Sequence, residues 1–206
     1  EMGYGGTIRF LKNVIGLWIV QECRREWAKA GRQYTYEQLT KMAEQAEPLK
    51  CLIDPQDARF LKPNDMPGKI ASYCRETNQN LPKTPGEIIR CVLESLALAY
   101  CNVLHEICDI TGRNLKELHI VGGGSKNELL NQLSANAARV RVVAGPSEAT
   151  AIGNLLIQAV ALNHLSSIAD VRRVVRHSFP VRTYVPMEES TWQRAYDRFQ
   201  ELMARS

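Results

Sequence analysis

The sequence lacks several features that mark special classes of protein. We find no apolar run of about 18 residues and therefore predict no membrane-spanning segment. The first residues contain no apolar stretch of the signal-peptide type, and the chain shows no internal repeat or low-complexity segment. Hydrophobic residues make up 45% of the chain and charged residues 23%, which is typical of a globular domain. We therefore expect a cytoplasmic protein.

A strong excess of charge of one sign is also missing. The 26 basic and 22 acidic side chains give a formal net charge of +4. Arginines cluster near the C-terminal end, but acidic residues surround them in the sequence, which is typical of a solvated helix face. Since no RNA- or DNA-binding motif accompanies them, we expect no nucleic-acid partner.

The six cysteines lack the spacing of a metal site. None form a C-x-x-C pair, and no histidine lies at zinc-finger spacing. The sequence therefore predicts no metal site and buried, reduced thiols. Cys74 and Cys91 are the best candidates for a disulfide, because each lies near one end of a loop that joins two helices. A cytosolic setting argues against that bond.

The first half of the chain is predicted to be helical. Apolar residues at spacings of three and four predict a first helix over residues 8–30. A capping box from Thr35 to Gln38 opens a second helix, and a Pro-rich loop follows with a short strand at 51–54. After a helix at 67–77, the start Thr84-Pro85-Gly86-Glu87 opens a long apolar helix that ends at Gly112 and should be largely buried.

The pattern changes after Gly112. Short apolar runs at 118–121 and 140–143 predict strands, and helices over 126–138 and 148–162 follow them. Such a β-α-β-α unit with short connections implies parallel strands. The fold class is helix-rich α/β in one domain, 1–206. We divide it into a helical part at 8–112, a β-α-β-α nucleotide part at 116–163 and C-terminal helices at 167–205, the last predicted helix covering 188–205.

Three consecutive glycines, Gly122 to Gly124, stand where the first predicted strand meets a helix. Ligands bind at this position in parallel βα units, and glycine leaves room for a flat ring or a phosphate. The alternative is a tight turn that needs glycine only for packing. A dinucleotide fingerprint fails because Asn127 stands in place of its third glycine, and no Gly-Lys-Ser/Thr follows as in a phosphate loop.

Two stretches around these glycines carry a family resemblance. Residues 119–127 (HIVGGGSKN) and 144–154 (AGPSEATAIGN) resemble the adenosine motif and the following helix of the FGGY carbohydrate kinases. Residues 9–18 (RFLKNVIGLW) and 53–60 (IDPQDARF) are similar to the branch of that family that phosphorylates L-rhamnulose. The resemblance runs from about residue 3 to residue 187.

The resemblance implies the C-terminal actin-like, ribonuclease H-like domain of a two-domain enzyme that transfers the ATP γ-phosphate to the 1-hydroxyl of L-rhamnulose. In that family the N-terminal domain supplies the sugar contacts, the Mg²⁺-linked carboxylates and the catalytic aspartate. We expect no catalytic residue in this chain, which would be an inactive fragment alone. Its missing strands would leave a sheet edge exposed and allow chains to associate with one another. Alternatives are a kinase for fuculose, xylulose or glycerol, and a non-catalytic interaction module.

The same resemblance selects the nucleotide-binding candidates. Gly123 should line the adenosine pocket, and Gly122 and Gly124 should shape the turn. Asn13 and Gln21 should face the nucleotide from the first helix, where eight residues separate them by about 80° around the axis and two turns along it. The alternative is that they are ordinary polar residues of an amphipathic helix. Asn127 should either orient the loop or start the next helix.

Overall fold

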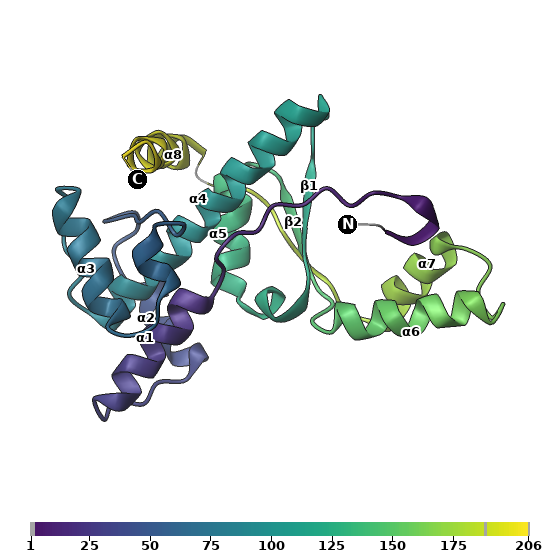
Figure 1. Cartoon of the computed structure of the whole chain (residues 1–206), viewed down its shortest axis with the longest axis horizontal. Coiled ribbons are helices and arrows are strands. Elements are labelled where there is room, and N and C mark those ends of the chain that lie inside the picture. The colour runs from purple at the N-terminus through teal and green to yellow at the C-terminus, as the bar shows by residue number, and fades with distance from the viewer. Residues whose placement is uncertain (1–2, 188, 206) are drawn as a thin grey trace.

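The helices of the N-terminal half and the last helix surround one long central helix. A computed structural model describes residues 3–187 and 189–205, and residue 188, which we placed in the last helix, lies outside them. The helical body contains α1 (Trp18–Lys29), α2 (Tyr36–Gln45), α3 (Met66–Glu76), α4 (Pro85–Thr111) and α8 (Glu189–Met203). Two short 3-10 turns, η1 (Tyr4–Gly6) and η2 (Ala58–Leu61), complete the first half. Figure 1 shows α4 running from this body toward the sheet.

Local capping signals place α2 and α4 as predicted. The Gln38 amide donates to Thr35 Oγ1 over 3.1 Å, and the Glu87 amide donates to Thr84 Oγ1 over 3.2 Å. In both boxes the Gln or Glu side chain accepts from the backbone amide of the capping threonine. Each box satisfies two amides that the helix itself leaves without partners.

The central helix is more apolar than we expected from the sequence. By length and composition α4 could cross a membrane, contrary to the expectation that no segment of this chain could. Most of its apolar stretch is buried, including Val92, Leu93 and Leu96, which have no exposed surface. This is the pattern of a core helix that is covered on all sides by the other elements.

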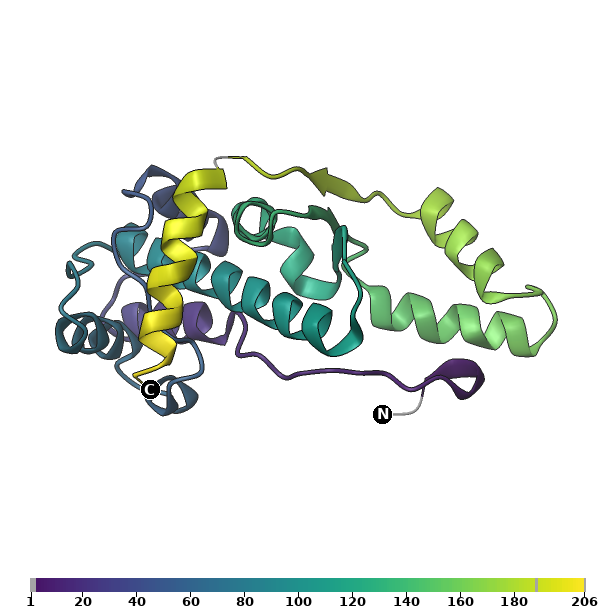
Figure 2. The same ribbon diagram turned by 90° about the horizontal axis from the view of Figure 1, so that it is seen from above.

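The first helix begins ten residues later than predicted. Residues 7–17 form no helix, and α1 starts at Trp18. The apolar side chains of Ile8 and Phe10 are 83% and 61% exposed, and hence the periodic pattern has no packing partner here. Because helices in proteins depend on such packing, the pattern alone does not make this stretch helical. In Figures 1 and 2 it runs as an extended strap between α1 and the far side of the sheet.

The predicted strand at 51–54 is also absent. These four residues are buried but form no strand, and side chains rather than a neighbouring strand satisfy their backbone. The Leu52 amide donates to Gln79 Oε1 over 2.9 Å, and the Ile53 amide donates to Ser95 Oγ over 2.9 Å. The prolines of this region predicted the loop correctly. The apolar residues 51–54 suggested a strand, but they are buried as part of that loop.

A three-stranded sheet lies beside the helical body. The parallel strands β1 (Glu117–Ile120) and β2 (Arg141–Ala144) confirm the prediction, with Leu118 opposite Val142. A third strand, β3 (Arg182–Tyr184), pairs antiparallel with β2 and was missed because it is only three residues long. The crossover between β1 and β2 consists of η3 (Gly122–Lys126) and α5 (Glu128–Ala138), and α5 packs against α4.

The remaining two helices form a hairpin beyond the sheet. Helices α6 (Ala149–Ala161) and α7 (Ile168–Ser178) pack on each other, and no residue of either helix is buried. The Asp170 amide donates to Ser167 Oγ over 3.2 Å, which makes Ser167 the N-cap of α7. Figure 2 shows the hairpin projecting away from the helical body.

Candidate functional site

A cavity of about 640 Å³ lies between α1, α2 and the triglycine turn. Its volume falls within the range of about 300–1,000 Å³ that is typical of small-molecule sites. The walls combine apolar side chains from α1, α2 and α4 with polar ones from the turn and the start of α5. The lining residues are Leu17, Val20, Gln21, Tyr36, Glu37, Leu39, Thr40, Lys41, Glu44, Ile89, Gly123, Lys126, Asn127 and Glu128.

The triglycine turn is held firmly at the end of the sheet. Gly122 has a φ of +75°, in the left-handed region that favours glycine, and its amide donates to the Pro146 carbonyl over 3.1 Å. The Ser125 hydroxyl donates to the Gly122 carbonyl over 2.7 Å, and the buried Asn131 amide group donates to the Ser125 carbonyl over 2.9 Å. These bonds fix the turn against the loop after β2 and against α5.

Gly123 faces open space. A Cβ atom built on this glycine would meet no atom within 4 Å, and its φ is outside the left-handed region. Nothing in the described part of this chain therefore requires glycine at position 123. Since Gly123 lines the cavity, the open space above it is available to a flat group that approaches the backbone closely. At Gly124 the nearest atom to such a Cβ is Ile120 Cγ2, at 3.9 Å.

Asn127 joins the turn to the next helix. Its Oδ1 accepts from the Leu130 amide over 2.9 Å, which makes Asn127 the N-cap of α5. Of the two roles considered for this residue, the structure places it at the helix start. The Asn127 amide donates to the Gly124 carbonyl over 3.1 Å and so also closes the turn. Asn127 lines the cavity as well.

The structure separates the two candidates that we expected on one helix. Gln21 lies on α1 and lines the cavity, together with Gly123 and Asn127. Asn13 precedes α1, is exposed, and does not line the cavity. The argument that placed both on one helix is wrong because residues 7–17 are not helical. The Asn13 carbonyl instead accepts from Gln56 Nε2 over 3.4 Å.

Helix α2 forms one wall of the cavity, which we did not predict from the sequence. Tyr36, Leu39 and Thr40 line the cavity from positions three and four apart, which share one face of a helix. Tyr36 is half exposed, and the Arg24 guanidinium lies 4.7 Å from the centre of its ring. The spacing was visible in the sequence, but no local signal shows that α2 packs beside the triglycine turn.

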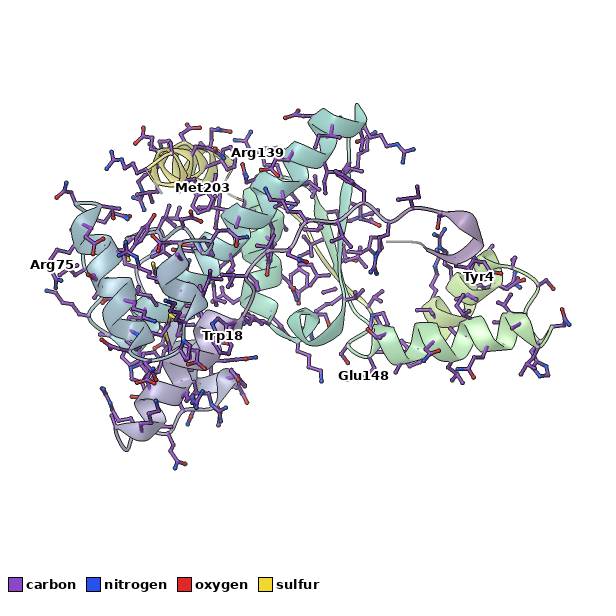
Figure 3. All side chains as sticks on the ribbon, in the orientation of Figure 1. Tyr4, Trp18, Arg75, Arg139, Glu148 and Met203 are labelled. Carbon is purple, nitrogen blue, oxygen red and sulfur yellow. The ribbon has the colours of Figure 1, made fainter. Side chains whose placement is uncertain are left out.

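Charged groups at the cavity are mostly paired. Glu37 Oε1 lies 2.9 Å from Lys41 Nζ, and this contact lowers the pKa of Glu37 and raises the pKa of Lys41. Glu128, in the first turn of α5, pairs with Arg182. Lys126 Nζ lies 4.0 Å from a carboxylate oxygen of Glu148, which Figure 3 shows at the beginning of α6.

These charges indicate which part of a ligand the cavity suits. The carboxylate of Glu128 stands where a phosphate would otherwise meet the positive end of α5. The Gly122 amide is already bonded to the Pro146 carbonyl, and the Asn127 amide to the Gly124 carbonyl. The cavity is therefore suited to a flat group with polar edges more than to a phosphate.

The indole N–H of Trp18 does not reach this cavity. Trp18 Nε1 donates to the Phe60 carbonyl over 3.2 Å, away from the residues that line the cavity. Figure 3 shows Trp18 at the beginning of α1. The aromatic ring at the cavity is that of Tyr36 instead.

Comparisons with known proteins agree with this geometry. Residues 1–162 match the C-terminal domain of the FGGY family of carbohydrate kinases. A rhamnulokinase from Bacteroides thetaiotaomicron is 44% identical over 199 residues, which are 97% of this chain and 40% of the relative. A rhamnulokinase from Bacillus subtilis is 42% identical over 188 residues, which are 91% of this chain and 38% of the relative. The chain thus spans about 40% of the length of these curated relatives.

Solved structures show the same fold at low sequence identity. A gluconate kinase from Lactobacillus acidophilus has a TM-score of 0.66 at 16% identity, covering 92% of this chain and 38% of that one. A xylulose kinase from Rhodospirillum rubrum gives 0.62 at 19%, covering 91% and 37%. A Plasmodium falciparum glycerol kinase with ADP gives 0.61 at 16%, covering 87% and 35%. These likenesses confirm the predicted helix-rich α/β fold.

Proposed function

The chain belongs to the FGGY family of carbohydrate kinases, and from this premise we propose that its cavity binds the adenosine end of ATP and ADP. One observation carries the proposal. Gln21 on α1, Gly123 in the triglycine turn and Asn127 at the start of α5 line one cavity of about 640 Å³. All three are among the nucleotide-binding candidates that the family resemblance implies.

The shape and chemistry of the cavity support an adenine nucleoside as the ligand. Gly123 leaves open space for a flat ring to approach the backbone, and the side chains of Leu39 and Ile89 supply apolar wall. Gln21 and Asn127 offer side-chain amides, which can both donate to and accept from a purine or a ribose. Tyr36 adds an aromatic ring at the same cavity.

Magnesium does not fit the described residues of this cavity. Mg²⁺ takes oxygen ligands in octahedral geometry, usually including carboxylates. Two of the cavity carboxylates, Glu37 and Glu128, are paired with Lys41 and Arg182. Among the residues that the structure describes, no group of three carboxylates or histidines converges closely enough to hold an ion. We therefore assign the Mg²⁺ of the reaction to another part of the kinase.

We further propose that the whole enzyme transfers the ATP γ-phosphate to the 1-hydroxyl of L-rhamnulose. The rhamnulokinase relatives are 42–44% identical over more than nine tenths of this chain, whereas the xylulose and glycerol kinases are 16–19% identical. In this proposal the sugar contacts and the catalytic aspartate lie outside this chain, and the chain alone is inactive. A cytoplasmic location, with no membrane or nucleic-acid partner, fits a small soluble sugar as substrate.

The substrate can be tested in the protein that joins this chain to its native upstream sequence. We expect ATP-dependent phosphorylation of L-rhamnulose to exceed that of L-fuculose, L-xylulose and glycerol in kcat/KM. Equal or greater activity on one of these three would overturn the substrate but not the nucleotide site. Gly123→Val should raise the KM for ATP, while Gly153→Ala, on α6 away from the cavity, should leave it unchanged.

A further inference from the structure

Three cysteine sulfurs converge in the core of the helical body, and none of these cysteines lines the nucleotide cavity. Cys51 lies in the loop after α2, Cys74 on α3 and Cys91 on α4. Their Sγ atoms all lie within 4.8 Å of one another, and none of the three residues is more than 2% exposed. Spacing in the sequence could not reveal this cluster because its members are separated by 23 and 17 positions.

Polar side chains fix the three elements around the sulfurs. The Gln79 amide donates to the Cys74 carbonyl over 2.8 Å, and the Gln79 side chain bonds both the amide and the carbonyl of Leu52. The Ser95 hydroxyl donates to the Cys91 carbonyl over 2.7 Å and accepts from the Ile53 amide over 2.9 Å. The residues after Cys51 are thus tied to the other two cysteines, and the three thiols are positioned in advance.

A positively charged side chain near the cluster favours negative charge on the sulfur atoms. Arg198, on α8, acts electrostatically on both Cys51 and Cys74, and its Nη2 donates to the Leu49 carbonyl over 2.9 Å. The nearby carboxylate of Glu94 is paired with Arg90, whose Nε lies 2.6 Å away. A divalent ion bound by three thiolates carries a net charge of −1, and the positive charge of Arg198 compensates it.

We propose that Cys51, Cys74 and Cys91 bind one thiophilic divalent metal ion through their three sulfur atoms. Thiolates select soft and borderline ions such as Zn²⁺ over hard ions such as Mg²⁺. With a bond of roughly 2.3 Å and the tetrahedral angles that zinc favours, the sulfurs bound to one ion stand about 3.8 Å apart. That spacing falls within the 4.8 Å that bounds all three sulfur–sulfur separations here. As the sulfurs bind, their thiol protons leave to solvent.

A disulfide between Cys74 and Cys91 is the competing chemistry. It would use two of the three thiols and would bring two sulfur atoms to about 2.0 Å. Cys51 would then remain as a thiol beside the bond. In the structure all three cysteines are free thiols. A metal ion would bind all three sulfur atoms near their present positions.

The proposal can be tested by titrating the reduced 206-residue chain with Cd²⁺ and Zn²⁺. We expect one ion per chain, a thiolate-to-metal charge-transfer band in the ultraviolet with Cd²⁺, and an increase in Tm with either ion. Mg²⁺ should produce none of these changes. Cys51→Ala, Cys74→Ala and Cys91→Ala should each weaken binding by more than roughly 100-fold, beyond the loss typical of a supporting contact.

Cys23→Ala is the matched control, because Cys23 is equally buried but lies outside the cluster. It should bind the metal like the unaltered chain. X-ray absorption of the Cd²⁺-loaded unaltered chain, which does not depend on the folding of any variant, should give three sulfur neighbours. Two or fewer sulfurs, no binding by the reduced chain, or unchanged binding by Cys51→Ala would overturn the proposal.

Discussion

At the residue scale, Gly123 in the triglycine turn and Asn127 directly after the turn have different roles. Gly123 leaves open space toward the cavity, whereas Asn127 closes the turn and caps α5. The first role concerns a ligand and the second concerns folding. Variants of these two residues should therefore affect different measurements.

Replacing the cap should lower stability. Asn127→Ala removes the side-chain acceptor of the Leu130 amide and should reduce the free energy of unfolding by about 1 kcal/mol. Asn127→Asp keeps an oxygen acceptor at the helix N-terminus and should stay close to the unaltered chain. Urea denaturation measures both. Equal stability of the Ala and Asp variants would contradict the capping role.

The buried carboxyl group of Glu94 should make stability depend on pH. Burial raises the pKa of Glu94 from its ordinary 4.5 to about 7, against the opposing effects of Arg90 and the Leu49 amide. The folded chain thus holds this proton more tightly than the unfolded chain. The resulting stabilisation is fully present below pH 4.5 and is lost as pH rises through about 7.

Glu94→Gln should remove this part of the pH dependence. Between pH 5 and pH 8 the unaltered chain should lose up to about 3 kcal/mol through this group, and the variant should lose less. Chemical denaturation at the two pH values gives the difference. The nearby Cys51 thiol and Arg90 are retained in both proteins, and parallel pH profiles would show that Glu94 does not titrate in this range.

At the element scale, the contact between α2 and α4 depends on the absence of a side chain. A Cβ atom on Gly86 would lie 2.5 Å from the Met42 carbonyl oxygen, and backbone cannot move aside cheaply. Gly86→Ala should therefore destabilise the chain by about 1–3 kcal/mol, in the range typical of overpacking. Thermal unfolding should show a lower Tm.

Gly153→Ala provides the comparison for Gly86→Ala. Position 153 lies on α6, and an added Cβ there meets no atom within 4 Å. Because alanine favours a helix more than glycine does, this variant should be neutral or slightly stabilising. If both variants lowered Tm equally, the close packing of α2 on α4 would not explain the loss.

The elements that the sequence predicted correctly are those with local signals. Capping boxes placed the starts of α2 and α4, and glycines with short apolar runs placed β1 and β2. The errors arose where tertiary contacts decide. Residues 7–17 have a helical pattern without a surface to pack on, and residues 51–54 are buried as a loop because Gln79 and Ser95 bond their backbone.

The candidate site divides in the same way. Family resemblance selected Gly123, Gln21 and Asn127, which the fold brings to one cavity. It also selected Asn13, which lies elsewhere, and it omitted the wall formed by α2. The converging cysteines were missed entirely, since their proximity depends on the packing of α3 and α4 against a loop.

At the scale of the whole molecule, several apolar surfaces lack cover within the described residues. Leu155 on the α6–α7 hairpin is 66% exposed, and Ile8 on the strap is 83% exposed. Figures 1 and 2 place the hairpin on the far side of the sheet from the helical body, and the strap runs from α1 toward it. β1 is an outer strand of that sheet, and association of chains through its edge stays a prediction.

The position of the cavity implies that this domain can bind nucleotide by itself. The cavity lies between α1, α2 and the triglycine turn, where the described residues are mostly well packed and Ile19, Leu39 and Leu130 are buried. It does not involve the exposed hairpin, and it reaches the strap only at Leu17, the residue before α1. Binding should therefore be measurable in the 206-residue chain, although the phosphates would lack their other partners.

Titration of the chain with ADP, followed by two-dimensional NMR, measures nucleotide binding at this cavity. We predict weak saturable binding, sub-millimolar to millimolar, with shifts at Gln21, Gly123 and Asn127. Gly123→Val should abolish these shifts while the chain remains folded, since no atom lies within 4 Å of the new Cβ, and Gly153→Ala should bind as before. Unchanged ADP binding by Gly123→Val would contradict the account.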